Sequence, residues 1–283
     1  MRSSKFQVPN SKFLMGATLE LGTWNLELGT SPLLVAIVGG SGSGKTWFAK
    51  KLQAALGRQA TRLSLDDFYR DRSRLSPARR ARLNFDHPRA IDWPGVERAL
   101  HDLLAGRPAR IPNYDFKTHC RRDHEKLLPP KPVVLMDGLW LLHRRSLRRL
   151  FALRIFIDCP ARTRLRRRLA RDRRSRGRTA AAVREQFCET VDPMHARFVA
   201  PQQSRADVVL PANFGEREVR ELAKIFRAKG PHAKAAKTAK AGHKITLRPL
   251  RPLREAFREP ELRGHPDVLR YDLETRTLDE TSG

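Results

Sequence analysis

The segment from Leu33 to Thr46 constrains the fold of this chain more than any other part of the sequence. An uninterrupted apolar run, LLVAIV, is followed directly by GGSGSGKT, which fits the pattern G-x-x-x-x-G-K-[ST]. A helix-compatible stretch, Trp47 to Leu56, comes next. In such a strand–loop–helix unit the glycines let consecutive backbone N–H groups point at phosphate oxygens, and the helix N-terminus adds its positive dipole end. We therefore predict a phosphate-binding loop made of Gly39, Gly40, Ser41, Gly42, Ser43, Gly44, Lys45 and Thr46.

Two side chains of this loop predict its ligand. A lysine in this place pairs with the β- and γ-phosphates of a nucleoside triphosphate, and the following hydroxyl ligates Mg²⁺. Lys45 and Thr46 therefore predict ATP and Mg²⁺ as cofactors.

Four further apolar runs recur between helical stretches, at Thr61–Leu65, Val133–Met136, Arg154–Ile157 and Asp207–Leu210. Continuous apolar strands that alternate with helices indicate a parallel sheet covered on both faces. We predict an α/β fold of three layers with a five-stranded parallel sheet. Ligands of such sheets gather beyond the carboxyl ends of the strands, where Gly39, Asp66, Asp137 and Asp158 are expected.

Two of these acids suit phosphoryl transfer. Asp137 ends the run VVLM and is predicted to serve Mg²⁺; a helix N-cap before Gly138 is the alternative. Asp66 is predicted to accept the proton of an attacking hydroxyl, and Asp67 is considered as the cap of a following helix.

Five sequence blocks occur in an order that resembles one known family: GGSGSGKT, LDDFYR, NFDHPRAIDW, IPNYDFKTH and RRRLARDRRSRGR. The chain is similar to the uridine kinase (uridine–cytidine kinase) family of P-loop nucleoside kinases, within the phosphoribulokinase/uridine kinase superfamily. The similarity spans about Ser31 to Ala228. It implies a P-loop NTPase fold of the nucleoside-monophosphate-kinase type with an Arg-rich lid. It also implies ATP-dependent phosphorylation of the 5′-hydroxyl of uridine or cytidine for pyrimidine salvage. Asp137 departs from the glutamate often found at its position in the family.

The resemblance also assigns roles to individual residues. It makes Asp66 the base at the 5′-hydroxyl and gives the ribose hydroxyls to Asp86 and Arg178. Tyr114 and His119 are expected at the pyrimidine edge, with Phe85 and Phe116 around the base. Arg168 and Arg171 are expected in the lid over the phosphates and, with Lys45, complete the catalytic set, while Gln186 is expected near the substrate. Taken singly, the aromatic residues could instead be ordinary core side chains and His119 a surface residue.

The positive charge predicts polyanion partners without deciding between them. The chain carries 57 Lys and Arg against 30 Asp and Glu, a net +27, and residues 144–178 hold fifteen Arg against two acids. Nucleic acid, nucleotide phosphates and a merely solvated basic face all fit this charge. Few aromatic residues interleave the basic run, so we do not expect a nucleic-acid partner. A nucleic-acid-binding NTPase, a P-loop kinase for another alcohol such as a phosphorylated sugar or pantothenate, and a regulator without turnover stay as alternatives.

Composition and segment boundaries complete the expectations. No apolar run is long enough to span a membrane, no secretory signal is evident and the three cysteines fit a reducing compartment, so we expect a soluble cytoplasmic protein. Residues 1–30, with repeats at SKF and LELGT, are expected to be a disordered extension, 31–228 the kinase domain, and 229–283 a basic linker and tail. The family is commonly oligomeric, so a homo-oligomer is left open.

Overall fold

The computed structural model describes residues 32–228, and their central element is a parallel sheet of five strands. In sheet order the strands are β2 (Ala60–Ser64), β7 (Val133–Gly138), β1 (Leu33–Gly39), β8 (Leu153–Asp158) and β9 (Val208–Pro211). The central strand β1 pairs with β7 from Leu33 opposite Val133 and with β8 from Val35 opposite Leu153. The predicted five-stranded parallel sheet is confirmed, and each of the five apolar runs supplies one strand.

The observed strands extend one or two residues beyond most ends of the predicted runs, and two predicted runs include one residue that lies outside its strand, Leu65 and Asp207. Local polar hydrogen bonds explain these two. Leu65 opens a 3₁₀ turn, η3 (Leu65–Phe68), because the Ser64 hydroxyl accepts a hydrogen bond from the backbone N–H of Asp66 at 3.3 Å. Asp207 precedes β9, and its carboxylate accepts from the backbone N–H of Arg154 at 2.8 Å.

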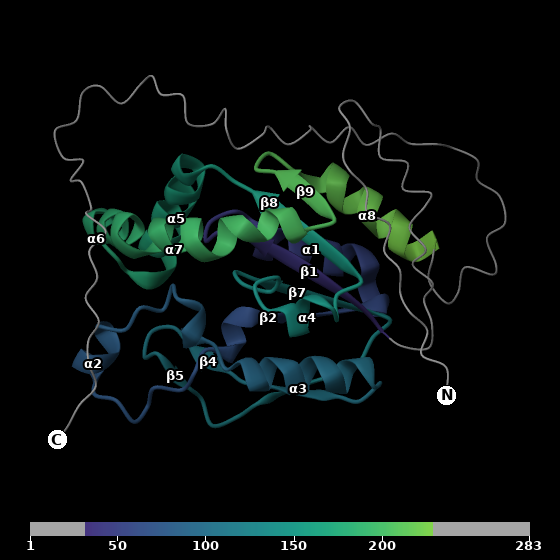
Figure 1. Cartoon of the computed structure of the whole chain (residues 1–283), viewed down its shortest axis with the longest axis horizontal. Helices are drawn as coiled ribbons and strands as arrows, with labels where there is room; N and C mark the ends of the chain where they lie inside the picture. The colour runs from purple at the N-terminus through teal and green to yellow at the C-terminus, as the bar shows by residue number, and fades with distance from the viewer. Residues whose placement is uncertain (1–31, 229–283) are drawn as a thin grey trace. The chain divides into compact units, whose positions relative to one another are not determined.

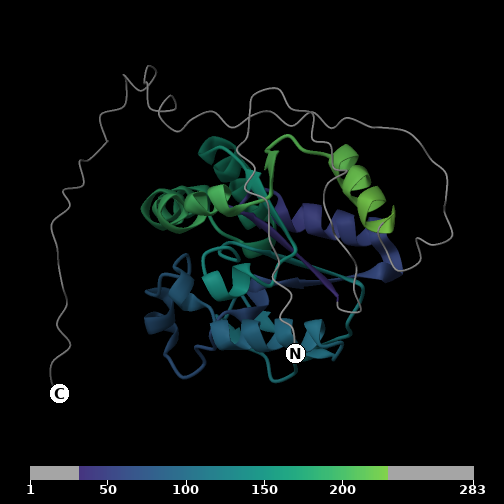
Figure 2. The same cartoon turned by 45° about the vertical axis from the view of Figure 1, so that its right-hand side comes forward.

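Side chains of β1 alternate between two buried layers, as expected for a sheet covered on both faces. Leu33, Val35 and Ile37 pack with α1 (Lys45–Leu56) and α8 (Glu216–Ala228), and the intervening residues pack with α3 (Trp93–Leu104). Figures 1 and 2 show α3 on one side of the sheet and α1 with α8 on the other. Each fully buried aliphatic side chain contributes roughly 1.5–3 kcal/mol to this packing.

The start of α3 follows from its sequence. Asp92 accepts a hydrogen bond from the backbone N–H of Gly95 at 3.1 Å, and a proline occupies the first turn, where its missing N–H leaves no donor unpaired. The sequence prediction of a helix at 47–56 is confirmed, although α1 begins two residues earlier, at Lys45.

The remaining elements outside the Arg-rich stretch are short, and two small antiparallel pairs, β3 with β6 and β4 with β5, lie in the connection between α3 and β7. Their bounds are η2 (Gly57–Gln59), α2 (Pro77–Ala81), η4 (Pro88–Ala90), β3 (Ala109–Ile111), β4 (Tyr114–Asp115), β5 (Cys120–Arg121), β6 (Lys126–Leu128) and α4 (Arg145–Arg148).

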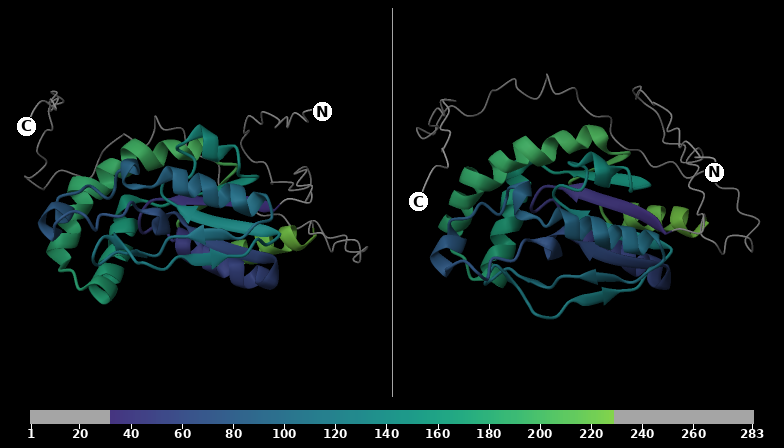
Figure 3. Two further views of the ribbon diagram at one scale, coloured as in Figure 1. Left: turned by 90° about the horizontal axis from the view of Figure 1, so that it is seen from below. Right: turned by 60° about the horizontal axis from the view of Figure 1, so that its bottom comes forward.

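The Arg-rich stretch after β8 is nearly continuous helix. It consists of α5 (Ala161–Arg176), α6 (Ala180–Gln186), the π-helical turn η5 (Phe187–Val191), α7 (Asp192–Met194), a second π-helical turn η6 (His195–Val199) and η7 (Ala200–Arg205). The views of Figure 3 place α5 and α6 at the same end of the sheet as α2. β1 reaches the phosphate-binding loop at this end.

Within residues 32–228, no helix has both the length and the apolar character that crossing a membrane requires. The expectations for residues 1–30 and 229–283 concern segments outside the described residues.

Candidate active site

The loop between β1 and α1 has the backbone that its glycines predict. Gly42 and Gly44 adopt positive φ angles of +84° and +102°, which side chains on L-residues disfavour. A Cβ on Gly42 would also lie 2.5 Å from the carbonyl oxygen of Arg164. Among the described residues no side chain caps α1 and no acid lies in its first turn, so its positive end suits an anionic phosphate. The loop therefore fits the phosphates of ATP.

Lys45 lies where the carboxyl ends of three strands meet. Its ammonium Nζ is 3.5 Å from the carbonyl oxygen of Gly40, and the residue is only 8% exposed. Burial lowers the pKa of Lys45, and the nearby carboxylates of Asp66 and Asp137 act to raise it. The structure thus brings the lysine and the two predicted acids into one electrostatic cluster, in which a bound phosphate would raise the pKa of the lysine.

Asp137 and Thr46, the two residues predicted to bind the metal, contact each other. The Thr46 hydroxyl donates to Asp137 Oδ2 at 2.7 Å, and the guanidinium of Arg62 donates to Oδ1 at 2.5 Å. Mg²⁺ favours hard oxygen ligands and usually takes one or two from the protein and the rest from water and phosphate, so this donor set fits it. The N-cap alternative for Asp137 is wrong, because the next helix, α4, begins only at Arg145.

Asp66 and Asp67 both lie in η3, directly beyond β2. Burial raises the pKa of Asp67, and the negative charge of Asp66 adds to the rise. The cap role considered for Asp67 is wrong: Ser64 caps η3, and Ser76 caps the next helix, α2. Of these two adjacent carboxylates, Asp66 is the one whose negative charge acts on the ammonium group of Lys45.

Four residues predicted around a base form one aromatic cluster. The rings of Phe85 and His119 stack with centroids 4.0 Å apart at an interplanar angle of 11°. The Tyr114 hydroxyl lies 3.2 Å from His119 Nδ1, and the Phe116 ring meets that of Tyr114 edge-on. Burial raises the pKa of Tyr114, so its hydroxyl keeps its proton at neutral pH. Tyr69, which the sequence analysis gave no role, anchors the cluster by donating to the carbonyl of Phe85 at 3.1 Å.

Of the two predicted lid arginines, Arg168 contacts the phosphate-binding loop directly. Arg168 is 4% exposed, donates to the hydroxyl of Ser41 at 2.8 Å and donates to Gln186 Oε1 at 3.0 Å. Arg171 is more exposed and pairs with Asp172 at 2.7 Å. Both lie on α5, and Arg168 fastens this helix to the loop.

Gln186 connects the lid to the residues predicted for ribose. Its Oε1 also accepts from Arg178 at 2.6 Å, and its carbonyl accepts from the hydroxyl of Thr190 at 2.9 Å. The same hydroxyl lies 3.3 Å from Asp86 Oδ2. Gln186 therefore contacts Arg178 directly and is linked to Asp86 through the hydroxyl of Thr190.

Sequence reasoning missed three residues that contact the loop. Arg164 is 2% exposed, donates to Asp192 at 2.5 Å and packs against Gly40 and Gly42. Arg167 donates to the carbonyl of Ser43 at 2.9 Å. His195 lies against Gly40, where burial and the charge of Arg164 lower its pKa to about 4. The two arginines were hidden by their many arginine neighbours, and no local motif marked the histidine.

Comparison with known proteins identifies the family of the chain. The sequence profile of the Phosphoribulokinase / Uridine kinase family matches residues 34–217. The chain belongs to this family. It is 39% identical over 185 residues to the uridine kinase of Halalkalibacterium halodurans, covering 65% of this chain and 88% of that protein. It is 39% identical over 181 residues to the uridine kinase of Deinococcus deserti, and this match covers 64% of this chain and 87% of that protein.

A solved structure shows the same fold. A Silicibacter sp. TM1040 protein, described as a candidate fructose transport system kinase, superposes with a TM-score of 0.54 at 24% identity. The match covers 65% of this chain and 91% of that one. The family resemblance and the predicted fold class are confirmed.

Proposed function

We propose that this chain is an ATP-dependent uridine kinase, which transfers the γ-phosphoryl group of ATP to the 5′-hydroxyl of uridine or cytidine in pyrimidine salvage. The observation that carries the proposal is the convergence of Lys45, Asp66 and Asp137 at the carboxyl ends of the strands. This set supplies a phosphate-binding cation, a base and a metal-binding carboxylate, which are the parts that phosphoryl transfer to an alcohol needs. The two relatives named uridine kinase support the choice of acceptor.

The aromatic cluster supports a nucleoside acceptor. Tyr114 and His119 offer hydrogen-bonding groups to the edge of a pyrimidine, and Phe85 and Phe116 offer ring surfaces to its faces. Asp86 follows Phe85 of this cluster directly in the sequence. Its carboxylate can accept hydrogen bonds from the two ribose hydroxyls. Uridine and cytidine present both features.

The residues of the chain divide the reaction between them. Asp66 accepts the proton that the 5′-hydroxyl loses as its oxygen forms the bond to the γ-phosphorus, while the bond between this phosphorus and the bridging oxygen breaks and ADP leaves. Lys45 and the loop N–H groups bind the phosphate oxygens, and Arg168 and Arg171 on α5 add positive charge from the opposite side. Thr46 and Asp137 would hold Mg²⁺, which would supply further charge neutralisation when bound with ATP. Closure of α5 over the loop would exclude water and so limit hydrolysis of ATP.

A coupled ADP-release assay with ATP and Mg²⁺ tests the proposal. Uridine, cytidine, ribulose 5-phosphate and pantothenate are compared as acceptors at equal concentration. We expect turnover with uridine or cytidine alone. Turnover confined to ribulose 5-phosphate or pantothenate would keep the kinase chemistry and overturn the acceptor. ATP binding without turnover on any acceptor would favour a nucleotide-binding regulator.

A further inference from the structure

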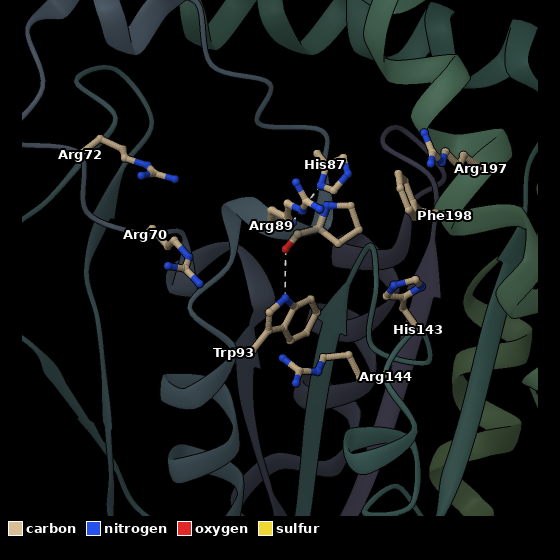
Figure 4. Close-up of a pocket in the computed structure, with 10 residues that line it drawn as sticks. Arg70, Arg72, His87, Arg89, Trp93, His143, Arg144, Arg197 and Phe198 are labelled. Carbon is tan, nitrogen blue, oxygen red and sulfur yellow. Dashed lines mark hydrogen bonds between the residues drawn. The ribbon is translucent and has the colours of Figure 1, made fainter. Parts of the chain in front are cut away.

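Five arginine side chains surround a hollow of about 640 Å³ that is lined by neither the phosphate-binding loop nor α5. Arg70 and Arg72 approach it from one side and Arg144 and Arg197 from the other, with Arg89 between them (Figure 4). These residues come from four separate segments of the chain, and a hollow of this volume is typical of small-molecule sites. We call it the arginine hollow.

None of these five guanidinium groups forms an ion pair within residues 32–228, whereas the partly buried Arg62 and Arg154 and the buried Arg164 do. Three of them are nevertheless held in place. Arg70 donates to the carbonyl of Ile91 at 3.2 Å. The guanidinium of Arg144 lies 5.4 Å from the centre of the Trp93 ring, and that of Arg197 lies 5.1 Å from the centre of the Phe198 ring. The cluster therefore presents positioned donors without a carboxylate to neutralise them.

Two histidines report the positive potential of the arginine hollow. Burial lowers the pKa of His87, and Arg89 and Arg197 lower it further. Burial likewise lowers the pKa of His143, with Arg205, Arg144 and His87 adding to the effect. None of the charges that shift these two histidines is negative. A multiply charged anion would relieve this repulsion.

The floor of the arginine hollow is formed by the rings of Trp93, His87 and Phe198. Trp93 is 7% exposed, and its indole N–H donates to the carbonyl of Pro88 at 3.0 Å (Figure 4). The rings of His87 and Phe198 meet edge-on with centroids 4.8 Å apart. Arginines around an aromatic floor suit an organic phosphate, because guanidinium groups bind phosphate oxygens in pairs and rings cover an organic body.

We propose that the arginine hollow is a binding site for a small organic polyphosphate, separate from the ATP site. The concave arrangement of the guanidinium groups favours a compact anion over a nucleic-acid strand, which would need an extended basic track. This assignment holds whichever alcohol the kinase phosphorylates, because it uses only the residues that line the hollow.

Isothermal titration calorimetry with sodium tripolyphosphate tests the proposal without knowledge of the natural ligand. Because the phosphate-binding loop also binds polyphosphate, the reference protein is Lys45→Ala. The hollow variant adds Arg89→Gln, Arg144→Gln and Arg197→Gln to it. The control variant instead adds Arg58→Gln, Arg98→Gln and Arg217→Gln, three exposed arginines outside the hollow, so both variants lose the same charge.

We expect the reference protein to bind tripolyphosphate at one site. The hollow variant should bind at least about tenfold more weakly, since it loses several charge-assisted contacts, while the control variant stays within about twofold of the reference. Equal weakening in both variants would show a diffuse effect of net charge and overturn the site, as would the absence of binding in the reference protein.

Two further measurements distinguish a lost site from an unfolded variant and a small ligand from a nucleic acid. Thermal unfolding checks that the hollow variant is folded; if it is not, the single changes Arg144→Gln and Arg197→Gln on the reference protein should each give part of the loss. A single-stranded RNA that displaces tripolyphosphate from the reference protein, and binds it more tightly, would overturn the assignment to a small ligand and identify a nucleic-acid surface.

Discussion

Asp66 and Asp67 are adjacent carboxylates on one turn, and the proposed reaction uses only the first as a base. Asp66→Asn replaces the proton acceptor with a carboxamide of the same shape, so we expect kcat to fall by about a hundredfold or more. The matched change Asp67→Asn should leave kcat close to that of the unmodified protein, because burial already disfavours the charge of Asp67. Steady-state kinetics with uridine measures both, and calorimetric ATP binding confirms an intact site. Near-normal turnover in Asp66→Asn would remove Asp66 from this role.

His195 makes stability depend on pH, and the direction follows from its lowered pKa. The folded protein keeps the imidazole neutral down to about pH 4, since burial, Arg164 and Lys45 outweigh Asp192, whereas the unfolded chain protonates it near pH 6.5. The contribution is therefore complete above pH 6.5 and is lost as pH falls towards 4. It amounts to at most about 3 kcal/mol before solvent screening.

Urea unfolding at several pH values between 7 and 4.5 measures this contribution. We expect the unfolding free energy of the unmodified protein to fall more steeply on acidification than that of His195→Gln, which lacks the titrating group. Equal slopes in the two proteins would show that His195 is accessible to protons in the folded state.

At the scale of elements, the loop between β1 and α1 depends on glycine for two separable reasons, a positive φ angle and the close approach of another backbone segment. Gly42 combines a positive φ with close contact to the backbone of Arg164, while Gly57, at φ +58°, has no atom within 4 Å of a Cβ placed there. Gly57→Ala should therefore cost only the backbone strain, about 1–3 kcal/mol, since its ψ of −125° lies outside the left-handed helical region. Gly42→Ala should cost more and also weaken ATP binding. Chemical denaturation and calorimetric titration with ATP measure the two effects; equal costs would show that the loop relaxes away from Arg164.

The same scale shows what the sequence could predict. The strands and the loop were predictable because apolar runs and glycine spacing are local signals, and Asp137 was predictable because it ends such a run. Arg62, which holds that carboxylate, comes from the neighbouring strand 75 residues away, and only the sheet order brings them together. His195 lies against Gly40 in a segment that contains the two π-helical turns η5 and η6, and no short periodicity in the sequence predicts such turns.

At the scale of the whole molecule, a net charge of +27 opposes the compact state unless ion pairs outweigh the repulsion. Several pairs are partly buried, such as Arg62–Asp137 and Arg154–Asp207, and salt screens these weakly, whereas it screens repulsion between exposed arginines well. We therefore expect the thermal midpoint to rise by about 2–6 °C between 50 and 300 mM NaCl, which corresponds to about 1–2 kcal/mol.

The arginine hollow should contribute to this rise, because its guanidinium groups repel one another without a carboxylate between them. The variant with glutamine at residues 89, 144 and 197 should therefore have a higher midpoint at low salt and a smaller increase with NaCl. Differential scanning calorimetry of both proteins at each salt concentration makes the comparison. A midpoint that falls with salt in the unmodified protein would show instead that attraction between its exposed ion pairs dominates the electrostatic free energy of the fold.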